Sequence, residues 1–84
     1  MEHKSRKRLP EDLAGLSRDE WVEIAKQARF SALDRDIVKY HIILGESQIT
    51  TGAYVDRDRK TVCRRMPYII ERAREVAKKL HMIE

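Results

Sequence analysis

The sequence predicts an all-α fold of four to five helices that ends in a long C-terminal helix. Apolar residues recur at spacings of three and four along most of the chain, and Ser and Asp residues stand where helix N-caps are expected. Only three glycines and two prolines interrupt this pattern. A chain of 84 residues has room for one modest core, so we expect a flexible basic arm over residues 1–10 and a single helical domain over residues 11–84.

The basic arm carries charge and almost nothing to bury. Four cations stand against one acid in residues 1–8, a net charge of +3. Two interpretations stay open: a solubilising tail, or an arm that follows phosphates or enters a minor groove of DNA. Residues 10–15 follow as a short turn or helix that ends at Gly15.

The clearest helix start is a capping box. Ser17 and Glu20 have the spacing at which each side chain can bond the other residue's backbone amide, and Leu16 and Trp21 occupy the hydrophobic-staple positions around it. We expect a helix from Arg18 to about Arg29. Its apolar face comprises Trp21, Ile24, Ala25 and Ala28. Trp21 is interpreted as a core anchor rather than a ligand platform, because buried aromatic residues dominate small cores.

The next helix is expected to be central, because its apolar residues cover most of its circumference. It begins near Ser31 or Asp34 and ends at Gly45, which suits a left-handed C-terminal stop. Its apolar residues are Leu33, Ile37, Val38, Tyr40, Ile42 and Leu44. His41 lies among them and is interpreted as a partly buried packing residue rather than a pH sensor.

Residues 47–66 are expected to form two helices around a tight turn. Ser47 can cap the first helix, which ends near Tyr54 and Val55. Asp58 can cap the second through the amide of Lys60 or Thr61.

The apolar spacing within this segment is typical of a helix-turn-helix. Gly52 and Val62 lie ten residues apart, with Val55 and Met66 as further apolar contacts. The first helix of such a motif needs a small residue where the second crosses it closely, and the second needs an apolar residue that faces back. The early residues of the second helix can then reach base edges in a DNA major groove. An ordinary helical hairpin with a solvated basic face would show the same pattern.

One apolar stripe continues to the C-terminus in steps of four, three, four, three and four, through Val62, Met66, Ile69, Ala73, Val76 and Leu80. Pro67 interrupts it, so the helix either kinks there or stops near Arg65 and restarts. The unbroken stripe favours a kinked or nearly continuous helix. The distal residues of the stripe either pack on the core or form a homodimer seam. That seam would comprise Ala73, Val76, Leu80 and Ile83. We favour the dimer, because the first three helices are short relative to a helix that extends to Leu80.

The charge distribution favours a polyanion as the ligand. Residues 9–55 have a net charge of −3, whereas residues 56–79 hold nine cations against four acids, a net charge of +5. The function predicted is therefore that of a small transcriptional regulator that binds double-stranded DNA. The residues expected to contact phosphates are Arg57, Lys60, Thr61, Arg65 and Arg72. The residues expected to read base edges are Arg59, Cys63 and Arg64. An acidic partner protein would be attracted by the same charge, which leaves a protein–protein adaptor as the alternative, and an anionic membrane surface would be attracted as well.

Three short segments resemble the helix-turn-helix of region-4 domains of bacterial sigma factors, of LuxR-type regulators and of small phage-type regulators. These segments are Leu33–Ile37, Gly45–Gln48 and Arg59–Arg65. The resemblance covers roughly residues 17–80. It implies that Thr61 and the arginines at 64 and 65 face phosphates or bases, and it adds RNA polymerase as an expected partner.

Three features of this chain differ from the pattern of that family, and one of them is Pro67, which falls where the recognition helix normally runs on. Gly52 stands where alanine is usual, and the pair at residues 56–57, Asp and Arg, replaces the usual glycine and apolar residue of the turn. We therefore expect Val55 to supply the packing that residue 57 would otherwise provide.

No catalytic motif or cofactor site is expected. The three histidines are scattered, none has a metal-ligand spacing with Cys63, and no phosphate-binding glycine loop is present. Cys63 lies among cations that favour a reactive thiolate, but the preferred interpretation is a small semi-buried residue. A single cysteine suits a reducing cytoplasm, and the sequence contains no apolar run long enough for a membrane span.

Overall fold

The computed structural model describes residues 9–84, and this part of the chain is helical without a strand, which confirms the predicted all-α fold. Residues 1–8, and with them most of the predicted basic arm, lie outside the described residues. The elements in chain order are α1 (Glu11–Ala14), α2 (Arg18–Ala28), α3 (Ala32–Ile37), the π-helical η1 (Val38–Ile43), α4 (Gln48–Tyr54) and α5 (Arg59–Lys79).

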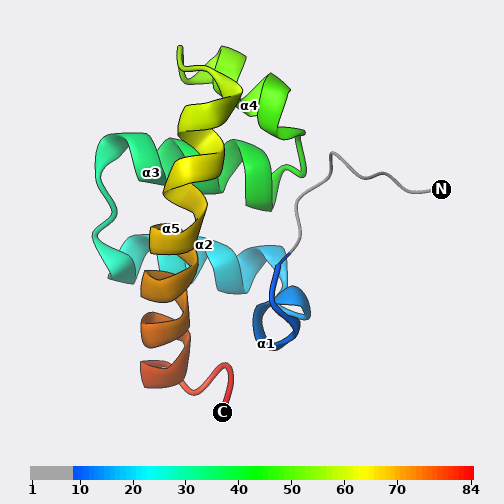
Figure 1. Cartoon of the computed structure of the whole chain (residues 1–84). Helices are drawn as coiled ribbons and strands as arrows, with labels where there is room; N and C mark the ends of the chain where they lie inside the picture. The colour runs from blue at the N-terminus through cyan, green and yellow to red at the C-terminus, as the bar shows by residue number, and fades with distance from the viewer. Residues whose placement is uncertain (1–8) are drawn as a thin grey trace, which may run out of the picture.

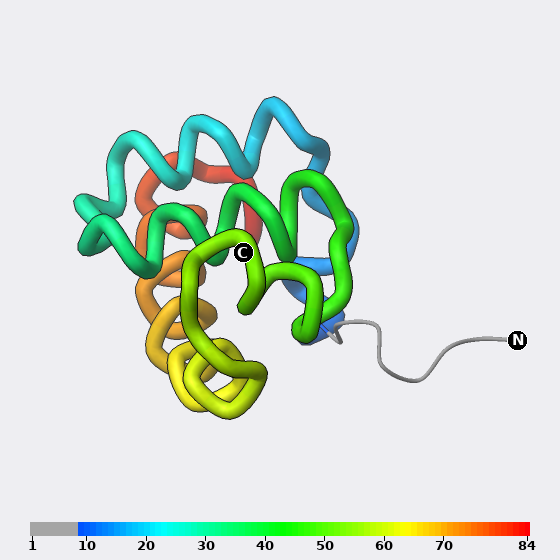
Figure 2. The backbone as a smooth tube through the Cα atoms, turned by 90° about the horizontal axis from the view of Figure 1, so that it is seen from above, coloured from blue at the N-terminus to red at the C-terminus, as the bar shows by residue number. Residues whose placement is uncertain are grey.

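The long helix α5 organises the other elements. Helix α2 and the continuous α3–η1 run side by side in opposite directions, and α5 crosses both steeply (Figures 1 and 2). Helix α4 packs against η1 and against the N-terminal part of α5. The first turns of α5 thus extend beyond α2 and α3, toward the end of the molecule that carries α4.

Side-chain caps begin four of the helices where the sequence predicts them. The Oγ atom of Ser17 accepts a hydrogen bond from the backbone N–H of Glu20 at 3.1 Å, and the Glu20 carboxylate accepts one from the N–H of Ser17 at 2.8 Å. Ser31, Ser47 and Asp58 cap α3, α4 and α5 in the same way, each through the N–H three residues later. Each cap satisfies an amide that the first helical turn leaves without a partner.

The core is formed by α1, α2, α3–η1 and the inner face of α5. Trp21 is 3% exposed, which confirms its predicted role as a core anchor. The buried apolar residues are Leu13, Trp21, Ile24, Ala28, Phe30, Ile37, Val38, Ile42, Val62, Met66, Ile69, Ala73, Val76 and Ala77.

The distal stripe of α5 belongs to this core, so the dimer seam predicted there is wrong. Ala73 is fully buried and Val76 is 4% exposed. Leu80 and Ile83 are partly buried and pack against the same cluster. The chain continues past α5 as a short tail, and Met82 joins the cluster as well. The short helices α1 and α2, together with this tail, therefore cover a surface that we expected to be exposed.

Helix α5 runs through Pro67 without a break, in agreement with the nearly continuous helix that the unbroken stripe favours, and the alternative of a restart does not occur. A proline has no N–H, so the carbonyl of Cys63 lacks the hydrogen bond that a regular helix would supply at this point. Buried Met66 and Ile69 flank Pro67 and hold both turns on the core. Tertiary packing thus maintains the helix across a residue that would otherwise interrupt it.

The π-helical segment at the end of the central helix was not predicted. The N–H of Leu44 donates to the carbonyl of Lys39, five residues earlier, at 2.9 Å. Gly45 follows with φ of 77°, as predicted for a left-handed stop. His41 is fully buried rather than partly buried, and its Nδ1 lies 2.6 Å from the carbonyl oxygen of Glu46. A carbonyl can only accept, so Nδ1 carries the proton and ties the end of η1 to the segment that leads into α4.

Candidate nucleic-acid interface

Helices α4 and α5 meet at the glycine predicted from the spacing. Gly52 is buried, and a Cβ atom added to it would lie 2.7 Å from the carbonyl oxygen of Arg57. The N–H of Arg57 donates to the carbonyl of Gly52 at 2.8 Å, and Asp56 turns the chain with φ of 60°. Asp and Asn are among the few non-glycine residues that adopt this conformation readily. Val55 is half-buried, and its predicted packing role at the turn stays a prediction.

Replacing Gly52 with alanine is expected to lower the free energy of unfolding by about 1 to 2 kcal/mol. The new methyl group would meet a backbone oxygen that the turn holds in place, and such overpacking costs about 1 to 3 kcal/mol against a gain in helix propensity of up to about 1 kcal/mol. Gly15→Ala is the matched control, because a Cβ atom at Gly15 meets nothing within 4 Å. Urea denaturation followed by circular dichroism measures both. Equal stability of the two variants would contradict the close crossing.

Asp58 caps the N-terminus of α5. One carboxylate oxygen accepts the backbone N–H of Thr61 at 2.9 Å, and this hydrogen bond holds the pKa of the Asp58 carboxyl below its ordinary value of 3.8. Arg64, one turn further, lowers this pKa in the same direction through its charge. The cap thus stays ionised at neutral pH, and the start of α5 is well defined.

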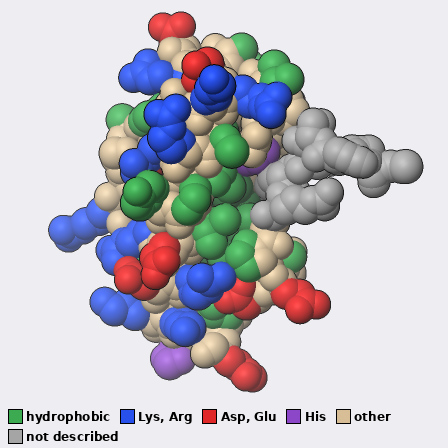
Figure 3. Space-filling model, in the orientation of Figure 1, with side chains coloured by type: hydrophobic (Ala, Val, Ile, Leu, Met, Phe, Trp, Pro, Cys, Tyr) green, Lys and Arg blue, Asp and Glu red, His purple; other side chains and the backbone are tan. Residues whose placement is uncertain are grey.

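The exposed face of the first turns of α5 is strongly basic. Arg59, Lys60 and Arg64 are exposed, and within residues 9–84 their side chains form no hydrogen bond or ion pair. Arg57 is exposed in the turn before them, where its guanidinium donates to the neighbouring carbonyl of Asp56 at 3.1 Å. Figure 3 shows several Lys and Arg side chains gathered, with acidic side chains beside them, at the end of the molecule that carries α4 and the start of α5.

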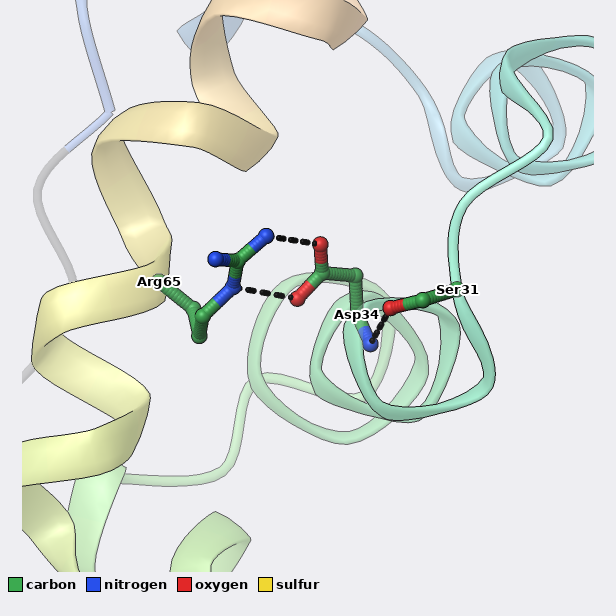
Figure 4. Close-up of polar contacts among 3 residues, drawn as sticks. All are labelled: Ser31, Asp34 and Arg65. Atoms are coloured by element: carbon green, nitrogen blue, oxygen red, sulfur yellow. Dashed lines mark hydrogen bonds and ion pairs between the residues drawn. The ribbon is translucent and has the colours of Figure 1, made fainter.

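Arg65 lies on the flank of α5 and is bound within the protein. Its Nε and Nη2 atoms donate to the two carboxylate oxygens of Asp34 at 2.9 and 2.7 Å (Figure 4). The Asp34 side chain is 8% exposed and the Arg65 side chain 38%. The bidentate bond raises the pKa of the Arg65 guanidinium above its ordinary value. This pair, formed by residues 31 positions apart, joins α3 to α5 and sets their relative orientation.

Arg72 is also bound within the protein. Its Nε donates to the carbonyl of Ala28, at the end of α2, at 2.9 Å, and its Nη1 lies 3.0 Å from a carboxylate oxygen of Glu75. The neighbouring Arg74 pairs with Asp12 of α1 at 2.8 Å. These two arginines therefore connect α5 to the first two helices.

The eight predicted contact residues thus divide into two groups. Six of them lie together at the α4–α5 turn and on the first turns of α5: Arg57, Arg59, Lys60, Thr61, Cys63 and Arg64. The other two, Arg65 and Arg72, bind Asp34 and Ala28. Cys63 is exposed, so its interpretation as a semi-buried residue is wrong.

The sequence reasoning missed one exposed residue on this face. Tyr68 is 63% exposed, and the guanidinium carbon of Arg65 lies 4.8 Å from its ring centroid. The spacing of four residues from Lys60 to Arg64 and again to Tyr68 could have indicated it, because residues at such spacings share one helix face.

Comparisons of the chain with protein-family models, with curated proteins and with solved structures found no match. Within residues 9–84, no group of three or more His, Cys, Asp or Glu side chains could hold a metal ion. None of the helices in this part of the chain has both the length and the apolar character needed to cross a membrane.

Proposed function

We propose that this protein binds double-stranded DNA as a helix-turn-helix regulator of transcription, with the N-terminal half of α5 in the major groove. The proposal rests on one observation: Arg59, Lys60 and Arg64 are exposed on the first turns of α5. Helix α4 packs closely against the chain at the start of α5 through Gly52. A helix presented in this way can approach base edges while its flanks contact phosphates.

The division of the arginines refines the roles of the predicted contacts. Arg57, Lys60 and Thr61 would contact phosphates, and the other exposed residues, Arg59, Cys63 and Arg64, would face the base edges. Arg65 and Arg72 would act as positioning residues, because their guanidinium groups already donate hydrogen bonds to Asp34 and to the carbonyl of Ala28. The predicted RNA polymerase contact and cytoplasmic location stay predictions.

Duplex binding over a salt series tests the proposal. The two cations assigned to phosphates, Arg57 and Lys60, would give a log–log slope of about −2, from about −0.9 per neutralised phosphate. Non-specific binding with a dissociation constant of roughly 1 to 100 μM is expected near physiological salt. A steeper slope would indicate that the cations in residues 1–8 also contact phosphates. Fluorescence anisotropy with labelled random-sequence duplexes measures both quantities.

Lys60→Ala is expected to weaken binding to all sequences alike and to make the slope shallower by about 1. The matched control is Lys78→Ala. Lys78 is exposed on the same helix, 18 residues after Lys60. This separation is about five full turns, so the two lysines share a helix face but lie about 27 Å apart along the axis. No detectable binding to any duplex at low salt would reject the proposal. It would favour the alternative, an adaptor that holds an acidic protein on the same cations.

A further inference from the structure

Tyr68 is a large exposed side chain on the same face of α5 as the cations. It is 63% exposed and lies four residues after Arg64 and eight after Lys60, so these three side chains form one row along the helix. The row begins with two cations and ends with an aromatic ring. Water disfavours such a ring, and residues 9–84 leave most of it exposed.

The ring of Tyr68 is oriented by a chain of contacts that starts in the core. Asp34 is 6% exposed and holds the guanidinium of Arg65 by two hydrogen bonds, and that guanidinium lies over the ring at 4.8 Å. A cation over an aromatic face is an attractive contact, and here the cation is itself fixed. Tyr68 therefore loses little conformational freedom when a ligand contacts it, which is the condition for a specific contact.

The position of Tyr68 along α5 suits the width of the groove. Eight residues of helix span about 12 Å, and the major groove of B-DNA is about 12 Å wide. If Lys60 lies near one wall of the groove, Tyr68 lies over the base edges on the side of the opposite wall. The apolar group that this groove displays is the 5-methyl group of thymine.

We propose that Tyr68 recognises thymine through contact between its ring and the 5-methyl group, with Asp34 and Arg65 as positioning residues. This inference rests on the proposed function, because it requires α5 to lie in the groove. The DNA-binding face of α5 would then make an apolar contact through Tyr68 in addition to the contacts of its cations.

The test begins with selection of a preferred duplex from a random pool by the full chain. Each thymine of that duplex is then replaced in turn by deoxyuridine, which removes only the methyl group. At one position the unmodified protein is expected to lose about fourfold in affinity, which corresponds to about 0.8 kcal/mol for one buried carbon. Tyr68→Ala should bind the thymine and deoxyuridine duplexes equally at that position, whereas Tyr68→Phe should keep the difference.

Four outcomes would overturn the inference. If no thymine position responds to deoxyuridine, or if Tyr68→Ala keeps the full response, the ring does not read the methyl group. Loss of the response in Tyr68→Phe would mean that the hydroxyl makes the contact instead. A protein that binds no duplex at all would fail at the earlier step and reject the proposed function as well. Circular dichroism checks the fold of each variant, and Tyr68→Gln, a good helix former, replaces the alanine variant if that one is unfolded.

Discussion

Replacing Trp21 with alanine is expected to lower the free energy of unfolding by about 3 to 5 kcal/mol. The indole is 3% exposed and follows directly on the capping box that starts α2. Truncation would remove its burial and leave a cavity between α2 and the rest of the core. A domain of 84 residues has a total stability of about 4 to 13 kcal/mol, so this single change removes a large part of it.

Urea denaturation followed by far-ultraviolet circular dichroism measures this loss. Tyr68→Ala is the control, because it also truncates an aromatic residue but at a position that is 63% exposed. Trp21 is the only tryptophan of the chain, so the emission of the unmodified protein reports on this site alone and should be shifted to the blue. Red-shifted emission, together with a stable alanine variant, would show that α2 is peripheral.

Replacing Val76 and Leu80 together with glutamate is expected to unfold the chain. Val76 is 4% exposed in the core, and Leu80 packs against the same cluster at the end of α5. Burial of an ionised carboxylate in this apolar cluster would remove its hydration, at a cost that a small domain cannot offset. Loss of the helical signal in circular dichroism is the expected result.

Val22→Glu is the matched control for this pair of substitutions. Val22 lies on α2 but is 41% exposed, so the same change of residue should leave the fold intact. If the double variant instead gave folded monomers while the unmodified protein sedimented as a dimer, the stripe would have to be the seam between two copies. That outcome would contradict the packing of α5.

Much of the fold could be predicted because its signals are local. The side chains of Ser17, Ser47 and Asp58 accept hydrogen bonds from backbone amides only three residues later. Both partners of each cap therefore lie within a four-residue segment of the sequence. The position of Gly52 followed from a geometric requirement that any close helix crossing imposes. The cluster of exposed cations at the start of α5 followed from these two results, once the helix boundaries were in place.

The remaining features depend on contacts between distant segments. Asp34 and Arg65 are 31 residues apart, so nothing in the spacing near Arg65 distinguished a bound guanidinium from a solvated one. The apolar stripe of α5 indicated a buried face, but periodicity alone could not say whether the same chain or a second copy covers it. The π-helical turns of η1 have no sequence signature that separates them from an ordinary helix.

Pro67 divides α5 into two parts with different mechanical roles. The part after it is anchored to α1 and α2 through Arg74 and Arg72, whereas the part before it carries the exposed cations. One backbone hydrogen bond is missing at the junction, so resistance to bending is lowest there. A force on the exposed cations would first reach the Arg65–Asp34 pair, which joins the part of α5 before Pro67 to α3. Each half of the helix therefore has its own anchor to the rest of the fold, and any bend at Pro67 is limited to what these two sets of contacts allow.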